Sequence, residues 1–522
     1  MVNIHWAEQL ANEIIAHKKP PFVISSGITT SGPAHLGTLC EFLYPSKIRD
    51  ILVQKGYETK FYFVADILDA FDSIPIVMQQ YEKQLAPHLG KPLASVPDFS
   101  GKSKSFGDHF LDEIKRIMEK FEVPCEVVRM NELYSSGKMD RYTKFFLENE
   151  KQAKEIVGRA TKETKEINKN RKNKETEKAE ETGKEEKTYW NPIMPVCAKC
   201  GKIATTRVLL HDGENYEYAC DKEVGYTKGC GFVGKDSIYN HKYKLVWRLH
   251  WAVWQDLLGT DCEGAGVDHF TKGGSRDTLE AIFREMFKKE PSIGYKFGFI
   301  LFKGQKYSKS KGIGMDMADI TALLPPEVIT FTLIRPDLDE NKNINPTKEN
   351  MLRAVEEYEQ SQGFAEKKLE ILDRAERKRA LAYLLSGKRH WKALFRDILM
   401  YHSIYSDWEK TGEALKDKEG VVYLKPYIEE WTKRDFIPDE LNFKYRPKKA
   451  EGYVREFFIS LSEDADALSI HNAIFSFVKQ KTIIPAELFR QIYLVLIGKE
   501  RGPKLGKLIY ALGINKIKRD IL

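Results

Sequence analysis

Two short segments carry residue types that could bind the phosphates of a nucleotide. The first is Ser26–Thr38, which reads SGITTSGPAHLGT and follows the apolar run that starts at Phe22. Glycines and hydroxyl residues let a backbone approach phosphates closely, and a helix beginning after them points its positive end at the anion. His35 and Thr38 would add side-chain donors, and Gly37 leaves room for a base or ribose. Taken alone, such a string is also typical of an ordinary turn before a helix.

The second segment is Lys303–Gly312, which reads KGQKYSKSKG and follows the apolar run 297–302. Lys306 and Lys309 could clamp a triphosphate and its departing pyrophosphate. Prepositioned cations are well suited to the charge that builds on leaving oxygens in phosphoryl or adenylyl transfer. A loop of lysine and serine is also common as a solvated surface turn, so the order and pairing of the two segments carry the argument.

Four cysteines form a third group that could do chemistry. Cys197 and Cys200 are a Cys-x-x-Cys pair, and Cys220 and Cys230 follow in the same stretch. Two thiolate pairs with small turn residues around them are typical of a structural zinc site. We therefore predict one structural Zn²⁺ remote from the phosphate-binding segments; four metal-free thiols are the alternative. The remaining cysteines are expected to be small core residues: Cys40, Cys125 and Cys262.

Alternating strands and helices must position these residues. Apolar runs at 22–27, 61–66 and 127–128 predict strands, and 41–56 and 110–121 between them predict helices. Strands separated by helices favour parallel βαβ units, whose ligands bind outside the carboxyl ends of the strands. The run 297–302 predicts a further buried strand, and the pattern becomes helical from about residue 325 to the end, as at 352–372 and 457–497.

The composition excludes several other classes of protein. The chain has 522 residues with 42% hydrophobic and 11% aromatic residues, which excludes fibrous and wholly disordered proteins. No signal peptide or membrane span is indicated by the sequence, and the odd number of seven cysteines argues against a secreted disulfide framework. The net charge of +7 permits a polyanionic partner without requiring one. We expect a soluble cytoplasmic protein without membrane contact; the sequence leaves its oligomeric state open and is compatible with a monomer.

One segment differs from the rest of the chain. Residues 154–187 hold 11 Lys/Arg and 9 Asp/Glu in 34 positions, which is typical of a solvated helix or a flexible connector; a basic arm that contacts RNA is the alternative.

The fold class expected is an α/β Rossmann-type nucleotide-binding catalytic domain with a zinc-containing insertion, plus an all-α C-terminal domain. The predicted parts are the start of the catalytic domain (1–150), a charged linker or solvated helix (151–188), a zinc-knuckle insertion (189–242), the second part of the catalytic domain (243–324) and the helical domain (325–522).

The two phosphate-binding segments together resemble the signatures of class I aminoacyl-tRNA synthetases. His35-Leu-Gly37-Thr38 is similar to the His-x-Gly-His/Asn motif, and Lys306-Tyr-Ser308-Lys309-Ser310 is similar to the Lys-Met-Ser-Lys-Ser motif. Further phrases narrow the resemblance to class I lysyl-tRNA synthetases, and it extends from Trp6 almost to the C-terminus with an interruption at 154–187. These phrases are Ser26-Gly-Ile-Thr-x-Ser-Gly32, Trp247-Arg-Leu-His-Trp251, Gly266-Val-Asp268-His269, Gly273-Gly-Ser275-x-Asp277-Thr278 and Ile497–Gly506.

The resemblance implies a reaction in two steps. ATP and L-lysine would form lysyl-adenylate and pyrophosphate, and the 3′ end of tRNA(Lys) would then take the lysyl group. His35, Lys306 and Lys309 would be the catalytic residues, with Mg²⁺ offsetting the phosphate charge, and positioning and electrostatics would suffice without a covalent nucleophile. The ATP-binding set would be Thr30, His35, Gly37, Thr38, Lys306, Ser308, Lys309 and Ser310.

The resemblance also implies a lysine pocket and an RNA-binding part. The lysine-binding residues would be Gly27, Thr29, Trp251, Asp268, His269 and Tyr295. Many family members carry aspartate where this chain has His250, so the polar partner of the lysine ammonium is left open. Lys499–Leu522 contains seven Lys/Arg and two acids, which suits phosphate contacts in a helical domain that reads the anticodon. The alternatives are a class I synthetase for another amino acid, a catalytically decayed tRNA-binding relative, or a small adenylyl transferase, which would need no long helical part.

Overall fold

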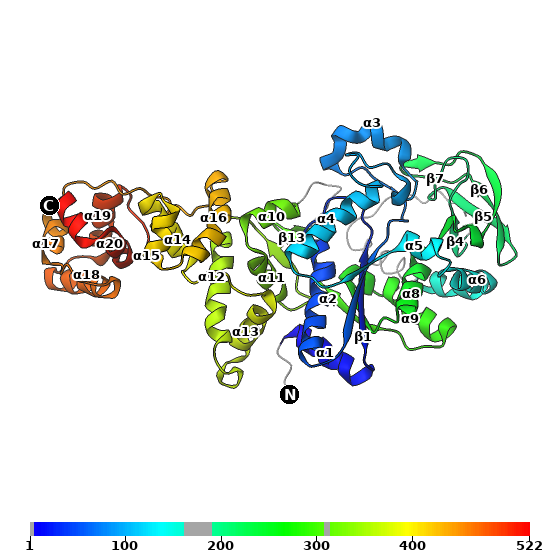
Figure 1. Cartoon of the computed structure of the whole chain (residues 1–522), viewed down its shortest axis with the longest axis horizontal. Helices are drawn as coiled ribbons and strands as arrows, with labels where there is room; N and C mark the ends of the chain where they lie inside the picture. The colour runs from blue at the N-terminus through cyan, green and yellow to red at the C-terminus, as the bar shows by residue number, and fades with distance from the viewer. Residues whose placement is uncertain (1–4, 161–189, 307–313) are drawn as a thin grey trace, which may run out of the picture. The chain divides into compact units, whose positions relative to one another are not determined.

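The described residues form two compact units. The computed structural model describes residues 5–160, 190–306 and 314–522 (Figure 1). Unit 1 comprises Met1–Met317 and Leu333–Ile344, and unit 2 comprises Ala318–Thr332 and Asn345–Leu522. Unit 1 is therefore built from two separate stretches of chain, and so is unit 2.

A five-stranded parallel sheet lies at the centre of unit 1. Its strand order is β12-β11-β1-β2-β3, and every neighbouring pair is parallel. The chain adds β2 and β3 on one side of β1 and later adds β11 and β12 on the other, so the order reverses between β1 and β11. This is the Rossmann-type topology, and the sequence prediction of that fold with a helical C-terminal part is confirmed. The strands are β1 (Phe22–Ile28), β2 (Thr59–Ala65), β3 (Glu126–Arg129), β11 (Cys262–Gly266) and β12 (Ile293–Phe297).

Helices α2 and α8 cover opposite faces of this sheet. Successive side chains of a strand point to opposite sides, so each helix packs against a different set of them. The ring of Phe42 on α2 packs against Phe63 on β2, 5.9 Å between centroids. On the other face, a Cβ added at Gly27 would lie 3.2 Å from the Trp254 ring of α8, so glycine allows the close approach of this helix. The labelled α-helices of unit 1 are α1 (Trp6–His17), α2 (Leu36–Gln54), α3 (Glu82–Leu85), α4 (Phe106–Lys120), α5 (Met130–Ser135), α6 (Asp140–Glu148), α8 (Trp247–Leu258) and α9 (Ser275–Ala281), and residues 151–160 are helical as well.

Smaller sheets complete unit 1. A three-stranded antiparallel sheet of order β5-β6-β9 carries part of the cysteine cluster, and β10 pairs antiparallel with β4. A third sheet has the order β14-β13-β15. The bounds are β4 (Ile193–Pro195), β5 (Thr206–His211), β6 (Asn215–Cys220), β7 (Glu223–Val224), β8 (Thr227–Lys228), β9 (Val233–Ser237), β10 (Tyr243–Leu245), β13 (Ile300–Phe302), β14 (Gln305–Lys306) and β15 (Lys342–Ile344).

The single strand expected over 297–302 is wrong. The chain leaves the parallel sheet at the end of β12 and joins another sheet at β13. Gly298 lies between them, and its N–H donates to the Leu338 carbonyl at 2.8 Å. A Cβ at this position would come within 2.5 Å of the Glu340 carbonyl oxygen. The break therefore depends on a close approach by residues 338–340, which a local sequence pattern does not reveal.

The second stretch of unit 1 closes onto its first helix. The carbonyl oxygen of Ile334 accepts a hydrogen bond from Trp6 Nε1 at 2.8 Å and lies 3.0 Å from Nε2 of His5. Strand β15 pairs in parallel with β13. The segment Leu333–Ile344 is thus an integral part of unit 1, although unit 2 residues precede and follow it in the chain.

The beginning of the predicted charged connector is part of the core. Residues 151–160 are helical, and Ala153, Ile156 and Val157 belong to a buried cluster with residues of α5, α6 and α8. In the sequence, the charged residues of this stretch make its three buried apolar positions hard to recognise. This corrects the expectation of a solvated segment for its first ten residues; positions 161–189 lie outside the described residues.

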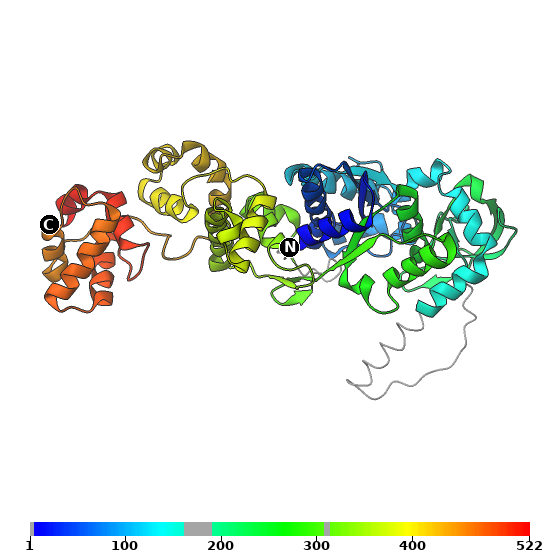
Figure 2. The ribbon, with the colours of Figure 1, turned by 90° about the horizontal axis from the view of Figure 1, so that it is seen from below.

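Unit 2 consists of helices in its described residues. Its core includes a cluster formed mostly by residues of the last five helices, together with Met400 and residues of the loops beside these helices; the five helices group together in Figures 1 and 2. The helical pattern predicted at 457–497 belongs to three helices with breaks at 461–466 and 482–484. The bounds are α10 (Met317–Leu323), α11 (Pro326–Ile334), α12 (Lys348–Ala365), α13 (Arg374–Ser386), α14 (Phe395–Tyr405), α15 (Trp408–Leu415), α16 (Lys418–Lys433), α17 (Gly452–Ser460), α18 (Ala467–Lys481), α19 (Pro485–Ile497), α20 (Leu505–Leu512) and α21 (Ile514–Ile521). Of these, α10 begins and α11 ends with residues assigned to unit 1.

Across the described ranges, no single helix has both the length and the apolar character needed to cross a membrane. The bent pair Met317–Leu323 and Pro326–Ile334 meets that test by length and composition alone.

Candidate active site

A cavity of about 260 Å³ lies at the carboxyl ends of the central strands. Ile28 at the end of β1, Gly266 at the end of β11 and Phe297 at the end of β12 line it, together with the first turns of α2. In open parallel sheets, ligands bind outside the carboxyl ends of the strands where the strand order reverses. The cavity is at that point of this fold.

The beginning of α2 supplies hydrogen-bond donors to the cavity. His35 is the N-cap residue, and its Nδ1 accepts a hydrogen bond from the Thr38 N–H at 3.2 Å. Thr38 Oγ1 accepts from the His35 N–H at 3.3 Å, which completes a capping box. Because Nδ1 is an acceptor, the neutral ring carries its proton on Nε2, and this N–H can donate to an anion. Thr38 likewise uses a lone pair and not its hydroxyl proton in the cap.

Gly37 keeps the wall of the cavity flat. A Cβ at this position would lie 2.7 Å from Cε1 of the His35 ring. Any larger residue would push the ring out of the position in which it caps α2. The nineteen-residue helix also directs the positive end of its dipole at the cavity. This arrangement suits a phosphate group.

Residues that follow the second predicted phosphate-binding segment return to the same place. Asp316 forms an isolated β-bridge with His35, and the Met317 N–H donates to the Ala34 carbonyl at 3.2 Å. Ile300 at the start of β13 lines the cavity. Lys306 lies in β14, while Ser308, Lys309 and Ser310 lie outside the described residues. The chain on each side of that segment is therefore held near the cavity.

Two acidic residues line the cavity, and only one of them was predicted from the sequence. Asp268 follows β11, and Glu41 projects from the second turn of α2. Burial, followed by the negative charges of Glu263 and Asp268, raises the pKa of the Glu41 carboxyl to about 8. Glu41 is thus a neutral acid at pH 7. Its spacing from Gly37 and Thr38, four and three residues, places all three on one helix face and is the signal that could have identified it.

Of the predicted lysine-binding residues, Thr29 and Asp268 line the cavity. Trp251 and Tyr295 are buried, and Trp251 Nε1 donates to Glu263 Oε1 at 2.8 Å. The ring of His269 lies 5.7 Å from that of Trp251. These three aromatic residues and Gly27 are not among the residues that line the cavity.

Glu263 is a buried carboxylate behind this wall. Ser25 Oγ donates to its Oε2, Trp254 Nε1 donates to the same oxygen at 3.1 Å, and Trp251 occupies the other oxygen. Burial raises the pKa of Glu263, and the three hydrogen bonds act against that rise. The carboxylate orients both indole rings and is buried away from the cavity surface.

Thr30 and His250 are turned to structural partners. The Thr30 hydroxyl is buried and donates to the Gly107 carbonyl in α4 at 2.9 Å, so this predicted ATP-binding residue does not line the cavity. His250 is buried, and its Nδ1 lies 2.9 Å from the Tyr134 hydroxyl. Burial, with help from the Lys244 charge, holds the pKa of His250 well below its usual value. The imidazole is therefore neutral, and His250 does not reach the cavity surface.

The four clustered cysteines converge. The Sγ atoms of Cys197, Cys200, Cys220 and Cys230 all lie within 4.8 Å of one another, and none forms a disulfide. Sγ of Cys197 is 3.7 Å from that of Cys230, and the Cys200–Cys220 distance is also 3.7 Å. Tetrahedral Zn²⁺ with bonds of about 2.3 Å requires sulfur atoms about 3.8 Å apart. The donor set and its spacing fit a zinc ion.

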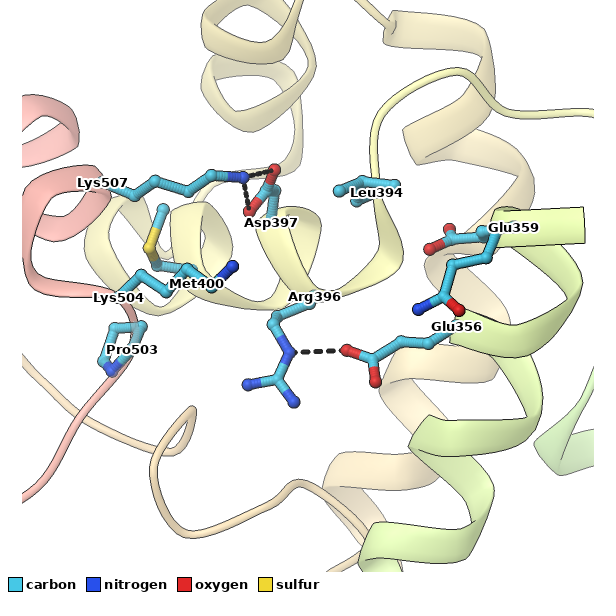
Figure 3. A pocket seen from close by; sticks show the side chains of 10 residues that line it. Glu356, Glu359, Leu394, Arg396, Asp397, Met400, Pro503, Lys504 and Lys507 are labelled. Carbon is cyan, nitrogen blue, oxygen red and sulfur yellow. Dashed lines mark hydrogen bonds and ion pairs between the residues drawn. The ribbon is translucent and has the colours of Figure 1, made fainter. Parts of the chain in front are cut away.

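Unit 2 contains a larger cavity, of about 470 Å³. Residues of α12, α14 and the beginning of α20 line it, and both signs of charge face it (Figure 3). Arg396 pairs with Glu356 at 2.6 Å, and Lys507 pairs with Asp397 at 2.6 Å. Its cations are thus partly neutralised by acids of the same wall.

Comparisons with known proteins agree with this geometry. The family described as "tRNA synthetases class I (K)" matches residues 4–388, more than half of the chain. A protein of Archaeoglobus fulgidus named lysine–tRNA ligase is 28% identical over 99% of this chain and 99% of its own length. A protein of the same name from Thermoplasma acidophilum is 25% identical over 100% of this chain and 99% of its own length. A solved glutamate tRNA ligase from Elizabethkingia meningosepticum has a TM-score of 0.40 and 13% identity over 96% of this chain and 98% of its own, a likeness too distant to carry an argument. The family match over residues 4–388 shows that the chain belongs to the family "tRNA synthetases class I (K)".

Proposed function

We propose that the chain is a lysine–tRNA ligase that forms lysyl-adenylate from L-lysine and ATP and transfers the lysyl group to the 3′ end of tRNA(Lys). One observation carries the proposal. In a chain of this family, the cavity where the strand order reverses holds Thr29, His35, Gly37, Thr38 and Asp268 together. These residues come from two segments more than 200 positions apart, and the proposed reaction requires both.

Positioned charge performs the chemistry in this proposal. His35, Lys306 and Lys309 steady the phosphates while the lysine carboxylate attacks the α-phosphorus and pyrophosphate leaves. Gly37, Thr38, Ser308 and Ser310 complete the ATP contacts, with Mg²⁺ offsetting phosphate charge. The capped start of α2 supports the role of His35, because it leaves an N–H donor on the ring. Thr30 would act by fixing the segment to α4 through its bond to Gly107.

The amino acid would occupy the Thr29 side of the cavity. Thr29 and Asp268 would contact it, and Gly27, Trp251, His269 and Tyr295 would shape the wall around it. The hydrogen bonds of Glu263 to two indole groups support this role, because they hold the aromatic wall in one orientation. An aliphatic stem with an ammonium tip suits an aromatic wall with acids nearby.

The other proposed parts bind metal and RNA. Cys197, Cys200, Cys220 and Cys230 would hold one structural Zn²⁺ in the insertion 189–242, and their sulfur spacing supports this. The helical part from 325 would read the anticodon. We also propose the functional boundaries at residues 150, 188, 242 and 324. They differ from the boundaries of the two compact units.

Pyrophosphate exchange tests the proposal directly. Purified protein with tRNA(Lys) present should exchange pyrophosphate into ATP when L-lysine is added. Glutamate, arginine and cysteine serve as matched controls and should not support exchange. Exchange with another amino acid would favour a different class I synthetase. The absence of exchange with every amino acid, with tRNA binding retained, would favour a decayed relative.

A further inference from the structure

A buried lysine is connected to the cavity through hydrogen bonds. Lys244 on β10 has a fully buried side chain, and its Nζ donates to Asp66 Oδ2 at 2.7 Å and to Asp69 Oδ1. Both acids follow the end of β2. The other oxygen of Asp69 accepts a hydrogen bond from Thr29 Oγ1, and Thr29 lines the cavity. The connection therefore runs from Lys244 through Asp69 to Thr29.

Charge on this connection is fixed. Burial by itself would lower the pKa of Lys244, but the negative charges of Asp66 and Asp69 and their hydrogen bonds raise it overall, so the amine stays charged. One cation between two carboxylates leaves one excess negative charge. The side chain of Asp69 is 31% exposed, against 1% for Asp66, so this charge faces the solvent side at Asp69. His250, whose Nε2 is 3.6 Å from Asp66, adds no charge because it is neutral.

The Asp69 carboxylate determines whether the Thr29 hydroxyl can donate a hydrogen bond to a ligand or only accept one. An ionised carboxylate only accepts hydrogen bonds, so the Thr29 hydroxyl must donate its single proton to Asp69. The lone pairs of Thr29 Oγ1 remain for the cavity that it lines. At this position the wall accepts hydrogen bonds and cannot donate one. An N–H group suits such a site, whereas a carboxylate or phosphate oxygen would be repelled.

We infer that Asp69 is a positioning residue that makes Thr29 an acceptor for an ammonium group of the amino acid substrate, with Lys244 holding Asp69 in place. This inference rests on the proposed function and deepens it, because it assigns the polarity of one wall of the amino acid site. Asp69 acts through Thr29, which would touch the substrate.

Three variants test this assignment by pyrophosphate exchange. Asp69→Asn can turn its amide N–H toward Thr29, which reverses the hydroxyl and presents a donor to the substrate. Thr29→Val removes the hydroxyl, and Thr29→Ser retains it. We expect Asp69→Asn and Thr29→Val each to raise KM for lysine about tenfold or more, because a hydrogen bond to a charged group is lost. Thr29→Ser should stay within about threefold of the wild type, and KM for ATP should change little in all three. Asp72→Asn, three residues on and exposed, is the matched control.

Two substrate analogues separate recognition from a structural role. Norleucine lacks the side-chain ammonium, and 6-aminohexanoate lacks the α-ammonium. As competitive inhibitors, they should respond differently to Asp69→Asn, with only the analogue that keeps the contacted ammonium losing affinity. Combining Asp69→Asn with Thr29→Val should cost no more than the larger single effect, because both act on one contact.

Other results would overturn the inference. An unchanged KM for lysine in Thr29→Val would do so even if Asp69→Asn failed to fold. Equal weakening of ATP and of both analogues, with a lowered Tm, would show that Asp69 is only structural. Wild-type protein without lysine-dependent exchange would instead overturn the proposed function itself, which is measured first.

Discussion

Glu41 shows how a carboxyl group could line the proposed phosphate site without repelling its ligand. Burial of its carboxyl, followed by the negative charges of Glu263 and Asp268, raises the pKa of Glu41 to about 8, so the proton is retained up to about that pH. A protonated carboxyl can donate a hydrogen bond, as His35 and Thr38 can. Asp268 is the other acidic residue that lines the cavity. At the scale of single residues, the protons on Glu41, His35 and Thr38 therefore determine which hydrogen bonds the cavity wall can donate.

The proton on Glu41 predicts a pH dependence of stability. The ordinary pKa of 4.5 is raised to about 8 in the folded chain, so between these values the folded state binds a proton that the unfolded state has lost. Stability therefore falls as pH rises from about 4.5 to 8. Glu41→Gln removes this dependence, so its Tm relative to the wild type should rise between pH 5 and pH 8. Glu82→Gln, at an exposed position, should show a constant difference. A constant difference for Glu41→Gln as well would contradict the raised pKa.

Lys309 provides a second prediction for a single residue. Lys309→Ala should slow lysine-dependent pyrophosphate exchange by about 100- to 1,000-fold, or ~2.7–4 kcal/mol, by analogy with the loss of one prepositioned donor to a developing charge. Fold and tRNA affinity should be nearly unchanged. Lys311→Ala, in the same segment, is the matched control and should exchange pyrophosphate at close to the wild-type rate. An equal effect of both substitutions would mean that only the general charge of the segment matters.

At the scale of elements, the sequence predicted what local patterns encode. The runs at 22–27 and 61–66 became β1 and β2, and the glycine- and hydroxyl-rich segment was placed correctly at the start of a helix. That helix begins at Leu36, five residues earlier than expected, because His35 and Thr38 cap it. Breaks that depend on distant backbone were missed, as at Gly298.

Site residues followed the same division. Thr29, His35 and Gly37 lie in one short motif that a sequence displays, whereas Asp69 meets Lys244 across 175 positions. No local pattern reports such a pair, and a lysine in a sequence is normally read as exposed. Glu41 was missed because an acid on a helix also suggests a solvent-facing position. Only its helical spacing from Gly37 and Thr38 hinted otherwise.

The antiparallel sheet of the insertion should depend on metal. Thiolate ligation couples metal affinity to local folding, so Cys220→Ser should lower zinc content and destabilise β5, β6 and β9 first. Elemental analysis of wild-type protein grown with ample zinc should find about one zinc per chain. Cys125→Ser, outside the cluster, should retain the metal. ATP binding should outlast the local damage, and wild-type protein without zinc would remove the site.

The charged segment allows a paired test of where the core ends. Replacing 161–187 with a short Gly/Ser linker should leave lysine activation unchanged, since loop length costs little. Replacing 154–187 also removes Ile156 and Val157 from the buried cluster. Loss of a buried isoleucine side chain alone costs about 2–5 kcal/mol, so this variant should show a clearly lower Tm. Equal Tm values for the two replacements would show that residues 154–160 contribute nothing to the core.

At the scale of the whole molecule, the two cavities described above belong to different units. The proposed ATP and lysine contacts all belong to unit 1, and the larger cavity with paired charges belongs to unit 2. A ligand that binds only the folded form of one unit stabilises that unit by mass action. The units therefore should respond separately to small ligands.

Calorimetry can measure that separation. Lysine with a non-hydrolysable ATP analogue, each at about 100 times its Kd, should stabilise unit 1 by roughly 2.7 kcal/mol per ligand and raise the midpoint of its unfolding transition. The transition of unit 2 should not move. Glutamate with the same analogue is the control for the amino acid. A single transition that shifts as a whole would show that the two units unfold as one cooperative body.

The interleaving of the two units has a consequence for synthesis on the ribosome. Domains commonly fold from the N-terminus as they emerge. Here β13 cannot gain its parallel partner, nor Trp6 its carbonyl acceptor, until Leu333–Ile344 has been translated. By then Ala318–Thr332 has also emerged and must wait, with its apolar side chains unburied, for the rest of unit 2. The nascent chain thus carries two unfinished cores at once, and that interval is when a chaperone would be most useful to it.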